Sequence, residues 1–103
     1  FYNRGYAHLR LRQHAAAIRD LGESLRLDPL DAWAHKSRGI AHLETGELEK
    51  AVADFSEAIR LDPYDPGTFG SRGVARGRLG QHQGAVADFS EAIRLDPRHA
   101  AAF

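Results

Sequence analysis

Hydrophobic residues recur along the chain at the spacing of amphipathic helices. In the segment 51–61, Val52, Phe55 and Ile59 fall near the 3.6-residue period, with charged residues between them. No segment alternates apolar and polar residues with a period of two over a useful length, so strands are not expected. The pattern predicts helices over residues 2–11, 14–27, 32–45, 48–61, 66–79 and 82–95.

Proline and glycine mark the ends of these predicted helices. The second helix of each pair is followed by a proline that prevents its continuation, at Pro29, Pro63 and Pro97. Gly46 and Gly80 end first helices, where a left-handed residue is favoured. Arg12 stands at the equivalent place in the first pair, and we expect it to strain that turn by about 1 kcal/mol.

The helices belong to a repeat of 34 residues. The segment AVADFSEAIRLDP occurs at 51–63 and again, identically, at 85–97, and a weaker copy runs over 16–29. A fixed period of this length indicates stacked copies of one supersecondary unit. We therefore expect a single domain over 1–103, with a truncated repeat at 1–31, complete repeats at 32–65 and 66–99, and the start of a fourth at 100–103.

Small residues, an aromatic residue and a proline recur at matched positions. They are Gly39, Ala51, Phe55, Ala58 and Pro63 in repeat two, Gly73, Ala85, Phe89, Ala92 and Pro97 in repeat three, and Gly5, Ala17, Leu21, Ser24 and Pro29 in repeat one. With the period, these residues make the chain resemble tandem tetratricopeptide repeats over essentially its whole length. The resemblance implies an all-α fold, a right-handed α-solenoid of antiparallel helix hairpins. Independently of any family, Gly or Ala where two helices cross permits their closest approach.

The charge and hydrophobicity of the chain indicate which classes of partner to expect. The 14 basic and 14 acidic residues cancel, so no strong attraction to nucleic acid or to an anionic membrane is indicated. No apolar run approaches the ~20 residues needed to span a bilayer. The chain begins at Phe1, inside a repeat, which we interpret as a piece of a longer chain. The sequence therefore leaves the compartment undetermined, and we expect neither a nucleic-acid nor a membrane partner.

Motifs for catalysis and for metal binding are absent from the sequence. There is no G-x-S-x-G elbow and no phosphate-binding glycine loop, and Ser56 and Ser90 are repeat equivalents that suit a structural role. The six histidines have no cysteine beside them and no His-x-x-x-His spacing. We expect no enzymatic activity, no cofactor and no metal site.

Arginine and aspartate recur together, always sixteen residues apart. The pairs are Arg4 with Asp20, Arg38 with Asp54, and Arg72 with Asp88. They suit either a row of charged ligand contacts or ion pairs that join the first helix of each repeat to the second. The threefold repetition of both partners favours the structural interpretation.

The resemblance implies that the first helices line a concave, peptide-binding groove. The matching residues here are Tyr2, Asn3, Tyr6 and Arg10, then Trp33, Lys36, Ser37 and Ile40, and then Ser71, Val74 and Arg78. Trp33 precedes the family's usual aromatic position by two residues, so it either projects into the groove beside Tyr6 as an anchor or packs inside. The groove cations predict a mild positive bias that suits a peptide with an acidic group.

One specific activity of the family is not expected. Its clamp for a C-terminal carboxylate uses Lys, Asn and Arg at positions that hold Tyr2, Tyr6, Ser37, Gly67 and Ser71 here. The sequence predicts a protein–protein interaction scaffold that binds a peptide or partner segment in the groove. The alternative is a structural spacer or self-assembly module that stacks through uncapped repeat ends, forming a homo-oligomer through its terminal repeats.

Overall fold

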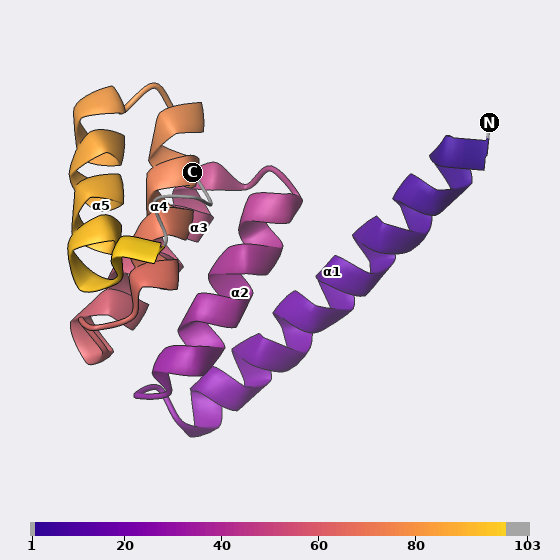
Figure 1. Ribbon diagram of the computed structural model, residues 1–103. Helices are drawn as coiled ribbons and strands as arrows, with labels where there is room; N and C mark the ends of the chain where they lie inside the picture. Colours follow the sequence, from indigo (N-terminus) through magenta and orange to yellow (C-terminus); the bar gives the residue numbers. More distant parts are fainter. Residues whose placement is uncertain (1, 99–103) are drawn as a thin grey trace.

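The computed structural model describes the backbone of residues 2–98 and the side chains of residues 12–98, and this part of the chain is all-helical. Its helices are α1 (Tyr2–Leu27), α2 (Ala32–Glu44), α3 (Leu48–Leu61), α4 (Pro66–Arg78) and α5 (His82–Leu95) (Figure 1). The predicted all-α class is confirmed. Among the described helices, none combines the length and the apolar character required to cross a membrane.

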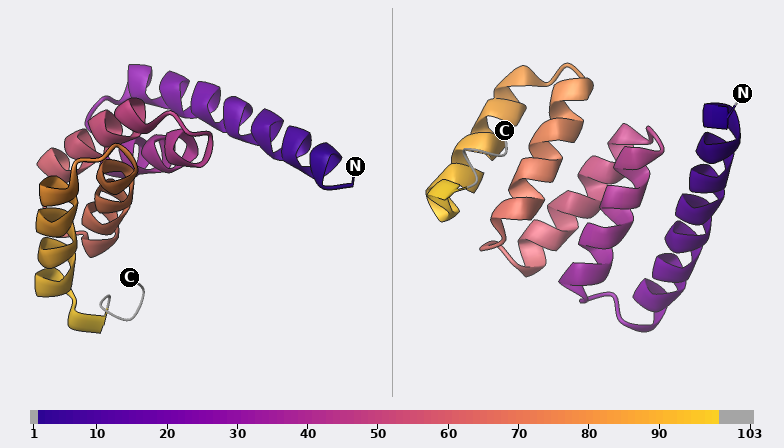
Figure 2. Two further views of the ribbon diagram at one scale, coloured as in Figure 1. Left: turned by 90° about the horizontal axis from the view of Figure 1, so that it is seen from above. Right: turned by 45° about the vertical axis from the view of Figure 1, so that its right-hand side comes forward.

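The helices form a stack of antiparallel hairpins. α2 pairs with α3, α4 pairs with α5, and α3 lies against α4 to join the two hairpins (Figure 1). α1 packs against α2 near the turn that joins them, while its N-terminal half extends away from the other helices (Figure 2). The arrangement is that of an α-solenoid.

The predicted break in the first repeat is wrong, because α1 runs without interruption from Tyr2 to Leu27. Both hairpin turns that do form use a glycine with positive φ, Gly46 at 83° and Gly80 at 82°. Arg12 stands where that glycine is needed, and a left-handed conformation costs an L-residue roughly 1–2 kcal/mol. The helix therefore continues, and backbone positions 4 and 20 lie about 24 Å apart along one axis. The first hairpin is not formed.

Local hydrogen bonds explain where the other helices begin and end. Asp31 caps α2 by accepting from the Ala34 N–H at 3.1 Å, and Asp65 caps α4 by accepting from the Gly67 N–H at 3.0 Å. After α2 the Glu47 N–H donates to the His42 carbonyl at 2.8 Å, which closes a Schellman turn. The predicted bounds of α2 to α5 are confirmed to within one residue.

The core lies where α3 meets both of its neighbours. Ala51 and Phe55 of α3 and Ala75 of α4 are fully buried against one another. Gly39 of α2 lies directly over the Phe55 ring, and a Cβ atom added to this glycine would fall 2.7 Å from Cε1 of the ring. Gly73 lies over Phe89 in the same way, so the predicted close approach of the paired helices is confirmed.

We predict that Gly39→Ala destabilises the protein by about 1–3 kcal/mol, because the new methyl group overlaps the buried Phe55 ring. Gly77→Ala is the matched control, since its Cβ would meet nothing closer than Ala85 Cβ at 3.9 Å. The control should gain about 0.5–1 kcal/mol from helix propensity. Urea unfolding measures both. Equal effects of the two substitutions would contradict the packing argument.

Candidate interaction surface

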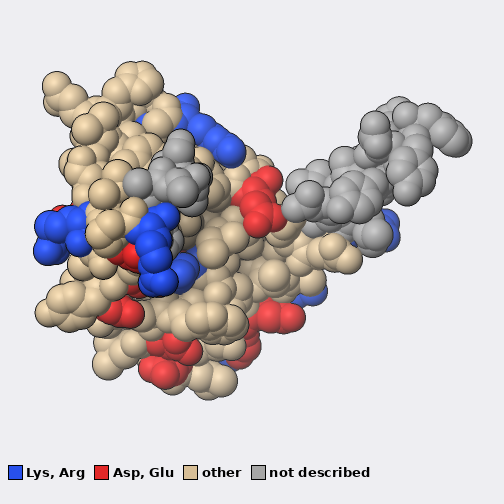
Figure 3. Space-filling view, viewed as in Figure 1, with Lys and Arg blue, Asp and Glu red and all other residues tan. Residues whose placement is uncertain are grey.

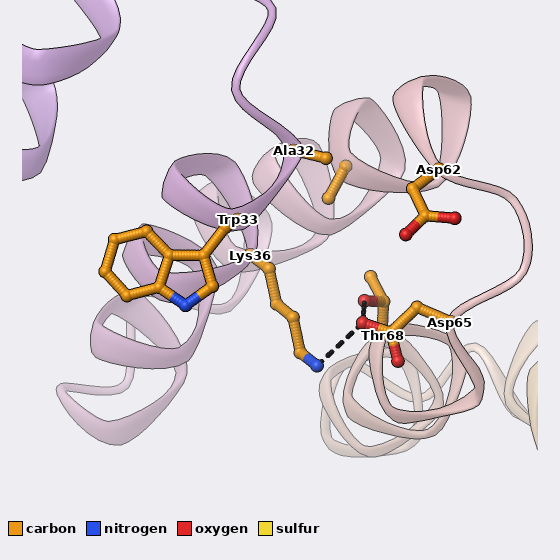
Figure 4. Close-up of a pocket in the computed structure, with 7 residues that line it drawn as sticks. Ala32, Trp33, Lys36, Asp62, Asp65 and Thr68 are labelled. Atoms are coloured by element: carbon orange, nitrogen blue, oxygen red, sulfur yellow. Dashed lines mark hydrogen bonds and ion pairs between the residues drawn. The ribbon is translucent and has the colours of Figure 1, made fainter.

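A pocket of about 170 Å³ opens between the start of α2 and the turn from α3 to α4. The side chains around it come from both hairpins (Figure 4). They are Ala32, Trp33 and Lys36 of α2, Ala58 of α3, Asp62 and Asp65 of the turn, and Thr68 of α4. The pocket thus exists only because the two hairpins stack.

Trp33 is largely in contact with solvent, with 68% of its surface exposed. Its indole lies on the far side of Lys36 from Asp65 (Figure 4). Of the two alternatives for this residue, a position inside the protein is therefore wrong. Tryptophan is among the residues most enriched at binding hot spots.

Lys36 spans the pocket and binds the opposite hairpin. Its Nζ donates to Asp65 Oδ2 at 2.7 Å. Asp65 also accepts from Thr68 Oγ1 at 3.0 Å and caps α4. Gly67 makes room for this contact, because a Cβ at that position would lie 3.1 Å from the Lys36 ammonium.

The pKa of Asp65 reflects two opposing effects. Burial alone would raise it, but the hydrogen bonds from Lys36, Thr68 and the Gly67 N–H outweigh burial and hold the pKa below its ordinary value. Asp65 is therefore ionised at neutral pH, and its charge is matched by that of Lys36.

Two of the predicted arginine–aspartate pairs join the helices of a hairpin. Arg38 on α2 donates two hydrogen bonds to Asp54 on α3, at 2.8 and 2.7 Å, and Arg72 on α4 donates two to Asp88 on α5, at 3.0 and 2.8 Å. The aspartates are only 6% and 3% exposed. The structural interpretation is confirmed for these pairs. In the third pair, the side chain of Arg4 lies outside the described residues.

Each buried aspartate has further basic neighbours. Arg76 also donates to Asp88, at 3.1 Å, and the equivalent position in the preceding repeat holds His42, whose Nε2 lies 3.6 Å from Asp54 Oδ2. Asp54 also has His35 Nδ1 at 3.7 Å. Within the described part of the chain, no group of three or more His, Cys, Asp or Glu side chains is arranged to hold a metal ion. These clusters hold the hairpins together.

The structure places only some of the predicted groove residues at the pocket. Trp33 and Lys36 meet at the pocket. The side chains of Tyr2, Asn3, Tyr6 and Arg10 lie outside the described residues, so their place in a groove stays a prediction. Four residues are half-buried on α2 or α4 without lining the pocket, namely Ser37, Ile40, Ser71 and Val74, and Arg78 is exposed at the end of α4. Ile40 packs against the core cluster.

Sequence reasoning missed the half of the pocket that the turn supplies. Asp62 and Asp65 lie in the turn, and Thr68 lies on α4 but was not among the residues that the groove prediction considered. A signal was present for Asp65, which precedes Pro66 as an Asp helix cap typically does. What the sequence could not show was that Lys36, 29 residues earlier, reaches this cap.

Models of known protein families match the chain. Two models of the tetratricopeptide repeat match the chain, one over residues 2–66 and the other over residues 68–99. No curated protein sequence matches it.

Solved structures show the same fold. The second such domain of Spaghetti (RPAP3), bound to the HSP90 peptide SRMEEVD, is 29% identical with a TM-score of 0.80, over 91% of this chain and 87% of that one. The corresponding domain of Arabidopsis OM64 is 28% identical with a TM-score of 0.82, over 93% and 79%. MamA is 26% identical with a TM-score of 0.80, and the match covers 94% of this chain but only 57% of MamA.

We predict that Arg38→Met destabilises the protein by about 3 kcal/mol, because it leaves the buried Asp54 carboxylate without its principal cation. Arg60→Met is the matched control, since Arg60 pairs with Glu57 on the exposed face of α3, and we expect little change there. Urea unfolding at pH 7 compares the two. A ligand-contact role for Arg38 would instead leave the stability unchanged.

Proposed function

This chain belongs to the tetratricopeptide repeat family, and on that premise we propose that it binds an extended segment of a partner protein along the surface formed by α2 and α4. The single observation that carries the proposal is Trp33, which is 68% exposed at the edge of a pocket that spans two hairpins. The family's fold is that of protein-interaction scaffolds, and the described residues offer no alternative reactive cluster.

Burial of the indole supplies the driving force in this proposal. An aromatic side chain buries about 150–250 Å² when it is covered, at roughly 25 cal/mol per Å². Covering the exposed part of Trp33 is therefore worth on the order of 2–4 kcal/mol, which is the size of a hot spot. Lys36 and Asp65 hold the pocket wall in place on both sides of the hairpin junction.

The structural neighbours support the class of function. The RPAP3 domain is bound to a peptide in its solved structure. Positions that would carry a carboxylate clamp in this chain hold Ser37, Gly67 and Ser71, so we propose a ligand of different chemistry.

We predict that Trp33→Ala weakens binding to a partner segment roughly 30-fold or more, the equivalent of a 2 kcal/mol hot spot. Peptides selected from a displayed random library against the wild-type protein serve as ligands, and calorimetry measures their affinity. Val86→Ala is the control, because Val86 is 63% exposed but lies on α5, away from the pocket. Selected peptides that bind both variants as tightly as the wild type would contradict the proposal.

A second candidate function, self-assembly, is favoured by the outer face of α5. Val86 and Ile93 are 63% and 39% exposed, whereas their identical copies Val52 and Ile59 are half-buried next to α4. The α5 face thus has the residues that receive a following helix in the preceding repeat, and a second copy of the chain is the proposed occupant.

If copies stack through α5, sedimentation should show a mass that increases with concentration at high micromolar protein, and Val86→Asp should return the protein to a monomer. Leu27→Asp is the control, since Leu27 is exposed on α1, distant from this face. A wild-type monomer throughout that concentration range would exclude self-assembly.

A further inference from the structure

The charges that line the Trp33 pocket do not cancel. Lys36 is the one cation among the lining residues, and it faces two carboxylates, Asp62 and Asp65. Its ammonium is already bound to Asp65, so the pair is neutral as a unit. Asp62 remains, with one carboxylate oxygen accepting from the Tyr64 N–H at 3.2 Å. The pocket therefore has a net negative charge.

The surroundings of the pocket extend this negative charge. The turns from α1 to α2 and from α3 to α4 lie at the same edge of the stack (Figure 1). Each of these turns has two aspartates, Asp28 and Asp31 in the first and Asp62 and Asp65 in the second. Acidic side chains gather along the lower edge of the face seen in Figure 3. An approaching cation is attracted to this edge even though the chain is neutral as a whole.

The size of the pocket limits its occupant. A volume of about 170 Å³ lies below the roughly 300–1,000 Å³ of pockets for drug-sized ligands and cofactors. A pocket of this volume fits one long side chain of a ligand. The exposed indole can pack against the aliphatic part of such a side chain, and its ring face attracts a cationic group at the end of the side chain.

We propose that the Trp33 pocket is a specificity site for an arginine or lysine side chain of the partner segment. The aliphatic stem lies along the indole, and the cationic head lies beside the Asp62 carboxylate. This inference rests on the proposed binding function and adds the chemistry of the ligand. It replaces the sequence-based expectation of an acidic ligand, because the charge of Lys36 is already neutralised by Asp65.

The chain provides its own reporter for this site. Trp33 is its single tryptophan, so intrinsic fluorescence reports directly on the edge of the pocket. The probes are three blocked peptides, acetyl-Leu-Arg-Leu-amide, the same peptide with citrulline, and the same peptide with glutamate. Citrulline retains the shape of arginine and removes its charge. Amide chemical-shift mapping in parallel locates the contact.

The arginine peptide should perturb the fluorescence of Trp33 and the backbone amides of residues 32–36 and of the non-proline residues in 62–68. We expect the citrulline peptide to bind roughly two- to fivefold more weakly, the range of one solvent-exposed charge pair, and the glutamate peptide to bind more weakly still. Equal affinity for arginine and citrulline, or a preference for glutamate, would overturn the proposal. So would the absence of any perturbation by the arginine peptide at millimolar concentration.

Two variants test the charges individually. Asp62→Asn should weaken the arginine peptide by the same two- to fivefold. Asp28→Asn is the matched control and should have a smaller effect, because Asp28 accepts from the Leu30 N–H at 3.2 Å just as Asp62 accepts from that of Tyr64, but it does not line the pocket. Lys36→Gln should strengthen the arginine peptide, since it removes a positive charge and leaves Asp65 available to the ligand. Weaker binding of the arginine peptide to Lys36→Gln would contradict the proposed cationic specificity.

The library peptides distinguish a failure of the cationic specificity from a failure of the proposed binding function. Library peptides that depend on Trp33 but carry acidic rather than basic residues would overturn the cationic specificity and leave the scaffold function intact. Library peptides that bind independently of Trp33 would remove the proposed function itself.

Discussion

The contact between a glycine and a phenylalanine inside each hairpin is the constraint on which the rest of the structure depends. With Gly39 over Phe55 and Gly73 over Phe89, the paired helices come so close that no larger residue fits. That distance brings Arg38 within reach of Asp54 and Arg72 within reach of Asp88. The buried ion pairs then orient each hairpin, because a carboxylate out of water requires its cation.

Because of this constraint, the two helices of a repeat have different roles: the second helix provides packing, and the first can differ between repeats. The identical segments at 51–63 and 85–97 contribute packing residues, and identical residues cannot give two repeats different specificities. The first helices differ instead. Trp33 has Gly67 as its equivalent one repeat later, and this glycine leaves the space that Lys36 occupies. The pocket is thus made by a large residue in one repeat and by the absence of a side chain in the next.

The sequence predicted the structure wherever local chemistry decides the conformation. Glycine, proline and aspartate set the ends of α2 to α5, and each acts within a few residues. The prediction was wrong at Arg12, where the repeat period suggested a turn but no residue could adopt the left-handed conformation. It missed the turn side of the pocket because the contact from Lys36 to Asp65 depends on how hairpins stack, and no local pattern encodes that angle.

The acidic edge of the molecule is itself a consequence of helix formation. Aspartate is favoured before a helix because its carboxylate accepts from free backbone N–H groups and faces the positive end of the helix dipole. Asp31 and Asp65 meet this requirement for α2 and α4. Since α2 and α4 begin at the same edge of the stack, their caps align there, whatever the net charge of the chain. These caps therefore add negative charge around the pocket, whereas Asp62, the carboxylate proposed to meet the ligand, ends α3 and starts no helix.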